Sequence, residues 1–418
     1  MDNTETTKQQ LYREREKRVM DAVSLKVPDR VPVTSHFSFF PARYCGITIK
    51  EMMYDPDKAW EAQLKTTLDF QPDMAQDVFG GRMVGAFFDI IDLKQMQWAG
   101  RQLGDDVPYQ FVEGEYMKAD EYDHFLSDMS DFVMRKFLPR ISGALKGLEK
   151  LTPFRNIFSY SRAVPAFAAF NLPEVQEALD TLKKAGEESV RIASYARRFN
   201  EKLKEEGFPL QGGGGATAPF DVLGDCFRGT KGLMLDMYRR PELVIKTCEK
   251  LLPMIVEAAV NSVKRSGIPR IFIPLHKGLD GFMSPDQFNR FYWPTLKELL
   301  VALINEGANP WVFWEGDATS RLEIIKDIPA GKAVYSFEAT DILKAKDILG
   351  DRICIRGNVP ISVLATGTPD DVRACCKRLI DYAGRDGGYI LDSSAGLDDA
   401  KTENVKAMFD FTREYGVY

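Results

Sequence analysis

The stretch WVFWEGD, Trp311 to Asp317, runs four bulky apolar residues directly into two carboxylates separated by one glycine. A short run of this kind is typical of a strand that is buried on both faces. Such strands occur in parallel sheets covered by helices, and Glu315 and Asp317 would then lie at the carboxyl end of the sheet. The stretch therefore predicts an α/β fold with polar side chains at the strand ends.

Further short apolar runs alternate with helical stretches from about Phe208 onward. The helical stretch 369–388 begins with Pro-Asp and ends in glycines, which are common helix boundary residues. Strands separated in this way indicate a parallel sheet, and this many units favour a closed (β/α)8 barrel. The other runs are FPLQGGGG (208–215), RIFIPLHKG (270–278), AVYSFEA (333–339), RICIRGN (352–358) and GYILDSS (388–394).

The N-terminal half is less regular. Helices are predicted around residues 12–23 and 57–68, and they are followed by the strand-like runs VPVTSHFS (31–38) and DMAQDVFG (73–80). Residues from about 97 to 152 mix hairpin-like pieces with a helix, and we interpret them as an inserted cap. Because no repeat or linker divides the chain, we expect a distorted barrel as a single domain over residues 1–418.

Composition excludes several classes of function. The chain has 418 residues, 44% of them hydrophobic, and a net charge of −6 with acidic and basic residues mixed, so no basic surface is expected for nucleic acid or an anionic membrane. The charged N-terminus lacks the apolar core of a signal peptide, and no apolar run is long enough to span a membrane. Six cysteines without a CxxC pair indicate reduced thiols in a cytoplasmic protein.

Polar residues recur where the predicted strands end. Since the carboxyl ends of barrel strands converge on one mouth, these side chains should lie close together. A histidine with carboxylates suits Zn²⁺ or a related divalent ion. Alternatively, Glu315 and Glu338 pair with Arg356, Lys277 or Arg321 and hold loops together at the rim. The residues in question are His276, Glu315, Glu338, Arg356, Asn358 and Asp392.

A substrate pocket is predicted at the same mouth. His36 ends the first strand-like run and either lines the pocket or packs in the core, while His124 in the insertion has the context of a surface or capping residue. Aromatic residues near the strand ends suit an apolar pocket, although core packing explains them equally well. They are Phe37, Phe39, Phe220, Phe313 and Trp314. The glycine run 212–215 lacks a phosphate-loop pattern and would let a ligand approach the backbone.

Several longer segments resemble the uroporphyrinogen decarboxylase superfamily, which includes cobamide-dependent methyltransferases. The resemblance covers nearly the whole chain and implies a distorted (β/α)8 barrel. The segments are PDRVPV (28–33), RYCGITIKEMMYDPDKAWEA (43–62), MSPDQFNRFYWPTLKEL (283–299), IRGNVPISVLATGTPDDV (355–372) and GGYILDSSAGLDDAKTENVKAM (387–408).

The chain departs from the motifs of two branches of the superfamily. Decarboxylases carry an arginine-rich N-terminal motif for the propionates of a porphyrinogen, and here only Arg43-Tyr44 looks similar. Thiol-alkylating methyltransferases carry HxCG where this chain has Phe313-Trp314-Glu315-Gly316, and a cysteine near Ser394, so both thiolate ligands are missing. Replacement of sulfur by oxygen ligands leaves a metal that is a stronger Lewis acid toward oxygen.

The resemblance then implies the methyl-donor protein of an O-demethylase system. We expect transfer of a methyl group from a small, methoxylated aromatic donor to the cobalt of a corrinoid on a partner protein. His276, Glu315 and Glu338 are the predicted metal ligands, Asp317 and Asp392 further catalytic candidates, and Arg356 a substrate-orienting group. A decarboxylase and a non-catalytic binding barrel are the alternatives, and a homodimer is possible.

Overall fold

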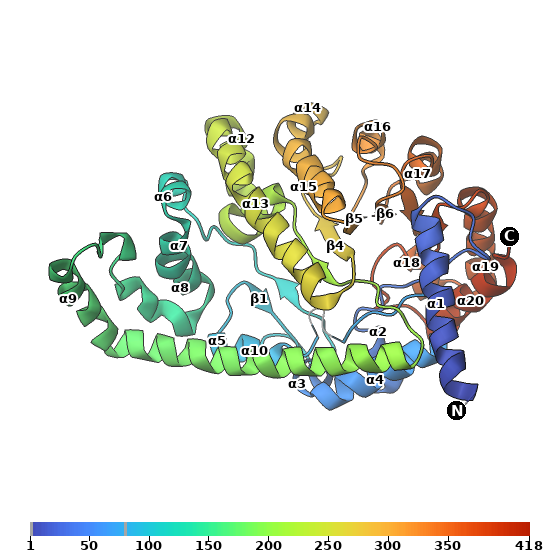
Figure 1. Ribbon diagram of the computed structural model, residues 1–418, viewed down its shortest axis with the longest axis horizontal. Helices are drawn as coiled ribbons and strands as arrows, with labels where there is room; N and C mark the ends of the chain where they lie inside the picture. The colour runs from blue at the N-terminus through green and yellow to red at the C-terminus, as the bar shows by residue number, and fades with distance from the viewer. Residues whose placement is uncertain (1–2, 79–81) are drawn as a thin grey trace.

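The computed structural model describes residues 3–78 and 82–418 and contains a six-stranded parallel sheet (Figure 1). Each strand pairs in parallel with the next one along the chain, as predicted from the alternation of apolar runs and helices. The strands are β3 (Gly214–Gly215), β4 (Arg270–Leu275), β5 (Asn309–Trp314), β6 (Val334–Phe337), β7 (Cys354–Arg356) and β8 (Tyr389–Ile390).

Two short N-terminal segments close this sheet into a barrel. Val33 forms a parallel bridge with Leu391, just beyond β8, and Ala75 forms one with Leu210, just before β3. The two segments meet where the N–H of Asp73 donates to the carbonyl of Val33 at 2.9 Å. They supply the two missing strand positions, which confirms the predicted (β/α)8 barrel; its distortion lies in these short first strands. Phe79 and Gly80, at the end of the second predicted strand run, lie outside the described residues.

Helices cover the outer face of the barrel because alternate strand residues point outward. In β4, Ile271, Ile273 and Leu275 are buried, whereas Phe272 and Pro274 are half-buried on the inner side. The covering helices are α13 (Pro241–Ser266), α15 (Trp293–Asn305), α16 (Leu322–Ile325), α17 (Ile342–Leu349), α18 (Ile361–Thr366), α19 (Pro369–Leu379) and α20 (Thr402–Tyr415). This alternation fixes which strand residues reach the barrel interior.

The N-terminal helix α1 (Asn3–Val23) closes the amino end of the barrel. Its residues Val19, Ala22 and Val23 are buried in one cluster with inward side chains of the barrel wall. Those side chains are Met74, Trp311, Val334, Cys354 and Ile390. Access to the interior is therefore from the carboxyl ends of the strands, where the predicted site residues lie.

A long excursion separates the second and third strand positions. It projects from one side of the barrel and returns along the 33-residue helix α10 (Figure 1). The predicted insertion, 97–152, covers only the middle of it, because α10 has the same amphipathic pattern as a barrel helix. Its elements include α5 (Gly85–Ile91), β1 (Met96–Gln97), β2 (Gln110–Phe111), α6 (Tyr122–Ser127), α7 (Met129–Phe132), α8 (Leu138–Ile141), η2 (Gly143–Lys150), α9 (Tyr160–Ala168) and α10 (Pro173–Glu205).

Shorter helices precede the excursion and support the first strand segments: α2 (Phe40–Cys45), α3 (Ile49–Tyr54) and α4 (Pro56–Phe70). All six cysteines are free, as predicted. Over residues 3–78 and 82–418, no helix has the length and apolar character needed to cross a bilayer.

Candidate functional site

Three polar side chains occupy one level at the carboxyl ends of neighbouring strands. The last residues of β4, β5 and β6 are paired in register, and His276, Glu315 and Glu338 follow them directly. The N–H groups of Glu315 and Glu338 donate to the carbonyls of Leu275 (3.2 Å) and Trp314 (3.1 Å), which extends the ladder by one residue. Because neighbouring strands are about 4.8 Å apart, the three side chains emerge at a single mouth.

His276 is held between two carboxylates. Its Nδ1 donates to Oδ2 of Asp225 at 2.6 Å, and its Nε2 lies 3.6 Å from Oε2 of Glu315. The hydrogen bond with Asp225 and then the one with Glu315 raise the pKa of His276 to about 10. The imidazole therefore carries a second proton on Nε2 at neutral pH unless another cation takes that position.

The pair His276 and Glu315 has the spacing of two ligands on one zinc ion. Bonds of about 2.1 Å in a tetrahedral site separate two ligand atoms by roughly 3.4 Å, close to the observed 3.6 Å. Asp225 on the opposite ring nitrogen is the usual outer partner of a metal-bound histidine. Burial and the charge of Glu315 raise the pKa of Glu338, which indicates that its carboxyl group lies near the pair. Within the described ranges, no three His, Cys, Asp or Glu side chains already form a metal-holding group. The pair fits a divalent ion, and Glu338 as third ligand stays a prediction.

The buried carboxylate of Asp221 fixes the loop that carries His276. It accepts hydrogen bonds from the backbone N–H groups of His276 (3.1 Å) and Lys277 (3.0 Å) and from the hydroxyl of Tyr292 (2.7 Å). Burial, followed by the charge of Asp225, raises the pKa of Asp221 to about 6. Lys277 in turn reaches Asp225 with its Nζ at 2.8 Å. Sequence reasoning missed Asp221 and Asp225; two carboxylates in the largely apolar run PFDVLGD, after the glycines, were the available signal.

A second polar group lies inside the barrel around Arg356. Its Nε donates to Oδ2 of Asp392 at 2.6 Å, and Thr34 donates to the same oxygen at 2.8 Å. The amide of Gln211, with its oxygen turned toward the guanidinium, accepts from Nη1 at 2.8 Å. Burial, then the charges of Arg82 and Arg356, lower the pKa of His36 to about 4, so His36 is neutral. The structure thus brings the predicted residues Arg356, Asp392 and His36 together.

Aromatic rings lie on the inner side of β4 and β5. Phe313 is half-buried on the inner side of β5 and stacks on Phe272 with a centroid distance of 6.4 Å and an angle of 28°. The ring of His36 is 6.2 Å from that of Phe272. Phe313 and His36 therefore lie beside Phe272, which the sequence pattern did not single out, and their substrate-binding role stays a prediction.

Four other predicted pocket aromatics are core residues instead. Phe37 stacks on Phe409, outside the barrel, and Trp314 packs edge-on against Tyr335. Strand alternation explains Trp314, because its neighbour Phe313 points inward. Phe220 and Phe39 are likewise buried, Phe220 against Tyr292 and Phe39 against Tyr109. The positions of Phe37, Phe220 and Trp314 do not support the substrate-binding role predicted for them. Phe39 lines a small surface pocket with Arg43, so its role stays a prediction.

Asp317 and His124 have local partners. Oδ1 of Asp317 accepts from the N–H of Thr319 at 2.8 Å and from its hydroxyl at 2.6 Å, which shapes the turn after β5. This arrangement gives Asp317 a turn-stabilising role, and its predicted catalytic role stays a prediction. His124 Nε2 lies 2.7 Å from Asp131 in the insertion, consistent with the surface or capping context expected for it.

The insertion borders the mouth on the side of the glycine run. The N–H of Met117 donates to the carbonyl of Phe227 at 2.7 Å, and Nη1 of Arg228 donates to Glu115 at 2.6 Å. Burial raises the pKa of Tyr109, and Glu315 contributes to that rise, which indicates that Tyr109 lies near the mouth. The segment 109–117 therefore lies beside the helical turn that carries Asp225.

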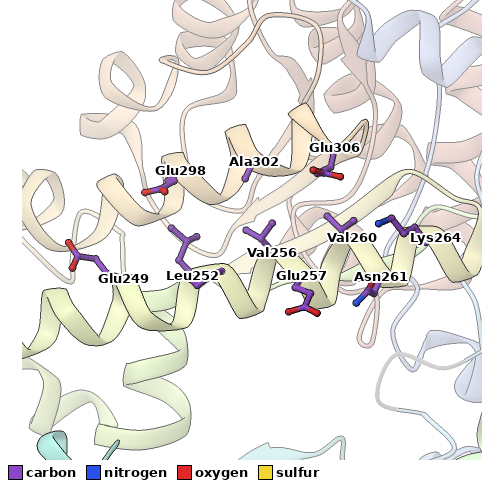
Figure 2. Close-up of a pocket in the computed structure, with 11 residues that line it drawn as sticks. Glu249, Leu252, Val256, Glu257, Val260, Asn261, Lys264, Glu298, Ala302 and Glu306 are labelled. Atoms are coloured by element: carbon purple, nitrogen blue, oxygen red, sulfur yellow. The ribbon is translucent and has the colours of Figure 1, made fainter. Parts of the chain in front are cut away.

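A groove of about 850 Å³ lies elsewhere, on the outer barrel wall between α13 and α15. Figure 2 shows Leu252, Val256 and Val260 of α13 pointing toward α15, with Glu249 and Glu298 along the edges. None of the predicted site residues lines this groove. The predicted site residues with titratable side chains lie at the barrel mouth and not in this groove.

Comparison with known proteins agrees with the barrel architecture. A methyltransferase from Methanosarcina mazei shares the fold, with a TM-score of 0.63 and 17% identity over 96% of this chain and 98% of that one. The uroporphyrinogen decarboxylase of Chlorobium luteolum is 25% identical over 277 residues, which are 64% of this chain and 72% of that protein. That of Chlorobium phaeobacteroides is 26% identical over 186 residues, so the match spans about half (52%) of its length. Residues 161–415 match the uroporphyrinogen decarboxylase (URO-D) family, and the chain belongs to that family.

Proposed function

We propose that the protein is a methyltransferase that moves a methyl group from a small, methoxylated aromatic donor to the cobalt of a corrinoid on a partner protein. The observation that carries the proposal is the position of His276, whose Nε2 faces the mouth beside Glu315 while Nδ1 is bound to Asp225. This arrangement supplies an electrophilic group at the open end of an aromatic-lined barrel.

The reaction requires such a group at the ether oxygen. In the proposed step the reduced cobalt attacks the methyl carbon, the cobalt–carbon bond forms, and the electron pair of the breaking carbon–oxygen bond passes to the phenolic oxygen. An N–H donor aimed at that oxygen stabilises the developing charge. His276 would donate its Nε2 proton, leaving a neutral phenol and an imidazole that keeps Nδ1–H on Asp225.

A divalent metal would serve the same oxygen. His276, Glu315 and Glu338 would hold the ion, with Asp225 orienting His276. When bound, the ion would act as a Lewis acid toward the ether oxygen. The proton and the metal require opposite states of His276, so their pH dependences differ.

The barrel interior suits a flat, apolar donor. The stacked rings of Phe272 and Phe313 offer a face for an aromatic ring, and His36 is neutral beside them. A methoxylated aromatic ring fits this chemistry better than a tetracarboxylate macrocycle, because the nearby cations have partners. Arg356 pairs with Asp392, and Lys277 pairs with Asp225.

Uroporphyrinogen decarboxylation is the second candidate, favoured by the family and by its named relatives. Arg43, the residue resembling the decarboxylase motif, is exposed and lies 3.3 Å from Asp399. That position gives it no role in gripping a ligand inside the barrel. A binding barrel without activity would be supported if the carboxylates were tied up in ion pairs. Glu315 and Asp392 have such partners, whereas Glu338 forms no ion pair among the described residues.

The test combines the purified protein, cob(I)alamin and a panel of methoxylated phenols. Methylcobalamin formation, followed by the cobalt spectrum, together with release of the demethylated phenol, is the expected result. Free cob(I)alamin and a corrinoid-loaded partner protein are compared, and His276→Ala is the control for the site. No methylation with any donor, together with carbon dioxide release from uroporphyrinogen, would replace the proposal by the decarboxylase.

A further inference from the structure

The groove between α13 and α15 has the length of a helix. Its lining residues run from Glu249 to Lys264 along α13 and from Glu298 to Glu306 along α15 and its C-terminal end. At 1.5 Å per residue, the stretch of α13 is about 22 Å long, which corresponds to roughly four helical turns. The volume of about 850 Å³ is therefore spread along two neighbouring helices as an elongated channel (Figure 2).

The floor of the groove is apolar and has helical spacing. Leu252, Val256 and Val260 follow one another at four-residue intervals on α13, and Ala302 faces them from α15. Leu252 is buried, whereas Val256, Val260 and Ala302 are half-buried. A helix that only covers a sheet carries polar side chains on its outer face. A row of apolar side chains between two helices instead accepts the side chains of a third helix, because residues three and four positions apart form the matching ridge.

The rim of the groove is acidic. Glu249 and Glu257 of α13 lie along one edge, and Glu298 and Glu306 lie along the other (Figure 2). All four residues are exposed. Over residues 3–78 and 82–418, none of these four carboxylates forms an ion pair, so their charges are open to a partner.

The cations of this region leave the rim uncompensated. Lys264, at one end, is the single cation among the residues that line the groove. Lys250 and Lys297 are the sequence neighbours of two rim glutamates, but they do not line the groove, and Lys297 pairs with Asp327 at 2.5 Å. Four glutamates against one lysine make the groove electronegative, so charge complementarity favours an occupant with lysine or arginine side chains.

Pro253 provides a further acceptor on the same side of α13. A proline inside a helix has no N–H, so the carbonyl of Glu249 lacks the donor that residue 253 would otherwise supply. Both residues line the groove. The carbonyl can therefore accept a hydrogen bond from a cationic side chain at the rim.

We propose that the groove between α13 and α15 binds a basic amphipathic helix of a partner protein. Its apolar side chains, three and four positions apart, would pack on Leu252, Val256 and Val260, and its lysine or arginine side chains would pair with the rim glutamates. A second copy of this chain is a poorer match because its net charge is −6. The groove is remote from His276 and Glu315, so this inference does not depend on the proposed reaction.

The test uses a fluorescent peptide of about 18 residues, or five helical turns, with leucine at every third or fourth position and lysine elsewhere. Fluorescence anisotropy measures its binding to the full chain at low and high salt. The wild type should bind the peptide one to one, and more weakly at high salt because the rim charges are exposed. A peptide with glutamate in place of lysine, and one with leucine and lysine in scrambled order, should not bind.

Two variants of the groove separate its charge from its shape. Glu257→Lys/Glu298→Lys should weaken binding at least about 10-fold, with an unchanged thermal midpoint because both side chains are exposed. Ala302→Trp should abolish binding by filling the groove. The control Glu187→Lys/Glu201→Lys makes the same change of charge at two exposed glutamates of α10 and should bind like the wild type.

Three outcomes would overturn the proposal. The first is a wild type that does not bind the lysine peptide. The second is equal binding by the wild type and both groove variants, which would place the peptide on another face. The third is equal binding of the scrambled peptide, which would reduce the interaction to charge alone. Self-association of the wild type that Ala302→Trp abolishes, in the absence of peptide binding, would assign the groove to a second copy.

Discussion

Nδ1 of His276 and Oδ2 of Asp225 are 2.6 Å apart, although the residues are 51 positions apart in the chain. Burial opposes the charge on Asp225, but hydrogen bonds from His276 and Lys277 nevertheless lower the pKa of Asp225. The carboxylate therefore stays ionised and fixes the proton on Nδ1, which leaves Nε2 to face the mouth. Orientation of His276 thus depends on the carboxylate bound to the ring nitrogen that faces away from Glu315.

Asp225→Asn should reduce methyl transfer by about 10- to 100-fold, the usual effect of losing an orienting partner. The amide oxygen can still accept from Nδ1, but the charge that raises the pKa of His276 is gone. If protonated His276 is the acid, the rate falls as pH rises through its pKa, so the alkaline limb of the pH–rate profile should move to lower pH. Asp327→Asn, an exposed aspartate paired with Lys297, is the control and should leave the profile unchanged. An unaltered profile in Asp225→Asn would remove Asp225 from the mechanism.

Glu315→Ala should lower methyl transfer by at least about 100-fold without unfolding the protein, because preorganised charged groups at the reacting atoms contribute on this scale. The Glu315 side chain is half-buried at the mouth, and its partner is His276 at 3.6 Å. A circular-dichroism melt should give a midpoint close to that of the wild type. Wild-type turnover in the variant would mean that Glu315 is neither a ligand nor a partner of His276.

The sequence was sufficient to predict the residues at the strand ends, but it did not predict the carboxylates that hold His276 in place. His276, Glu315 and Glu338 each follow an apolar run directly, and parallel register carried that pattern into space. Asp221 and Asp225 could not be found in this way, because they approach His276 from a helical turn and not along a strand. The alternation of side chains along a strand separates the aromatic residues: if Glu315 points inward, Phe313 does so too and Trp314 does not.

The extent of the excursion was missed for a different reason. Both α10 and the barrel helices are amphipathic. Hydrophobic periodicity does not distinguish a helix that covers a sheet from one that supports the projecting excursion. The exposed apolar stripe of α9 was visible in the sequence as YSRAVPAFAAF, but only the structure shows which side is outward.

Replacement of Asp221 should destabilise the protein. Asp221→Ala leaves two backbone N–H groups and the Tyr292 hydroxyl without their acceptor in a buried site, which should lower the free energy of unfolding by about 2–4 kcal/mol. Urea unfolding at pH 7 measures this loss. Asp327→Ala, at an aspartate that is 70% exposed and pairs with Lys297 at the surface, should have a smaller effect.

The pH dependence of that loss has a defined sign. The pKa of Asp221 is raised to about 6, so between its ordinary value and pH 6 the folded state binds a proton that the unfolded state has released. The wild type therefore loses up to about 3 kcal/mol of stability as pH rises through this window. Asp221→Ala lacks this effect, so the difference between the two proteins should be larger at pH 4.5 than at pH 7.5. A difference that grows with pH would contradict the assignment.

Metal content separates the two forms of the mechanism. If His276, Glu315 and Glu338 hold a divalent ion, elemental analysis of the purified protein should give about one ion per chain, and each single alanine variant should lower the occupancy at least 10-fold. Asp317→Ala, which removes an exposed carboxylate from the turn after β5, should retain the ion and serves as the control. With metal, activity should fall on chelation and on acidification, because a ligand histidine must be neutral. With the proton alone, chelators should have no effect, and activity should persist until pH approaches the His276 pKa of about 10.

Full activity without any metal would dismiss the three-ligand site but keep His276 as the acid. Metal bound equally well by all three variants would place the ion elsewhere.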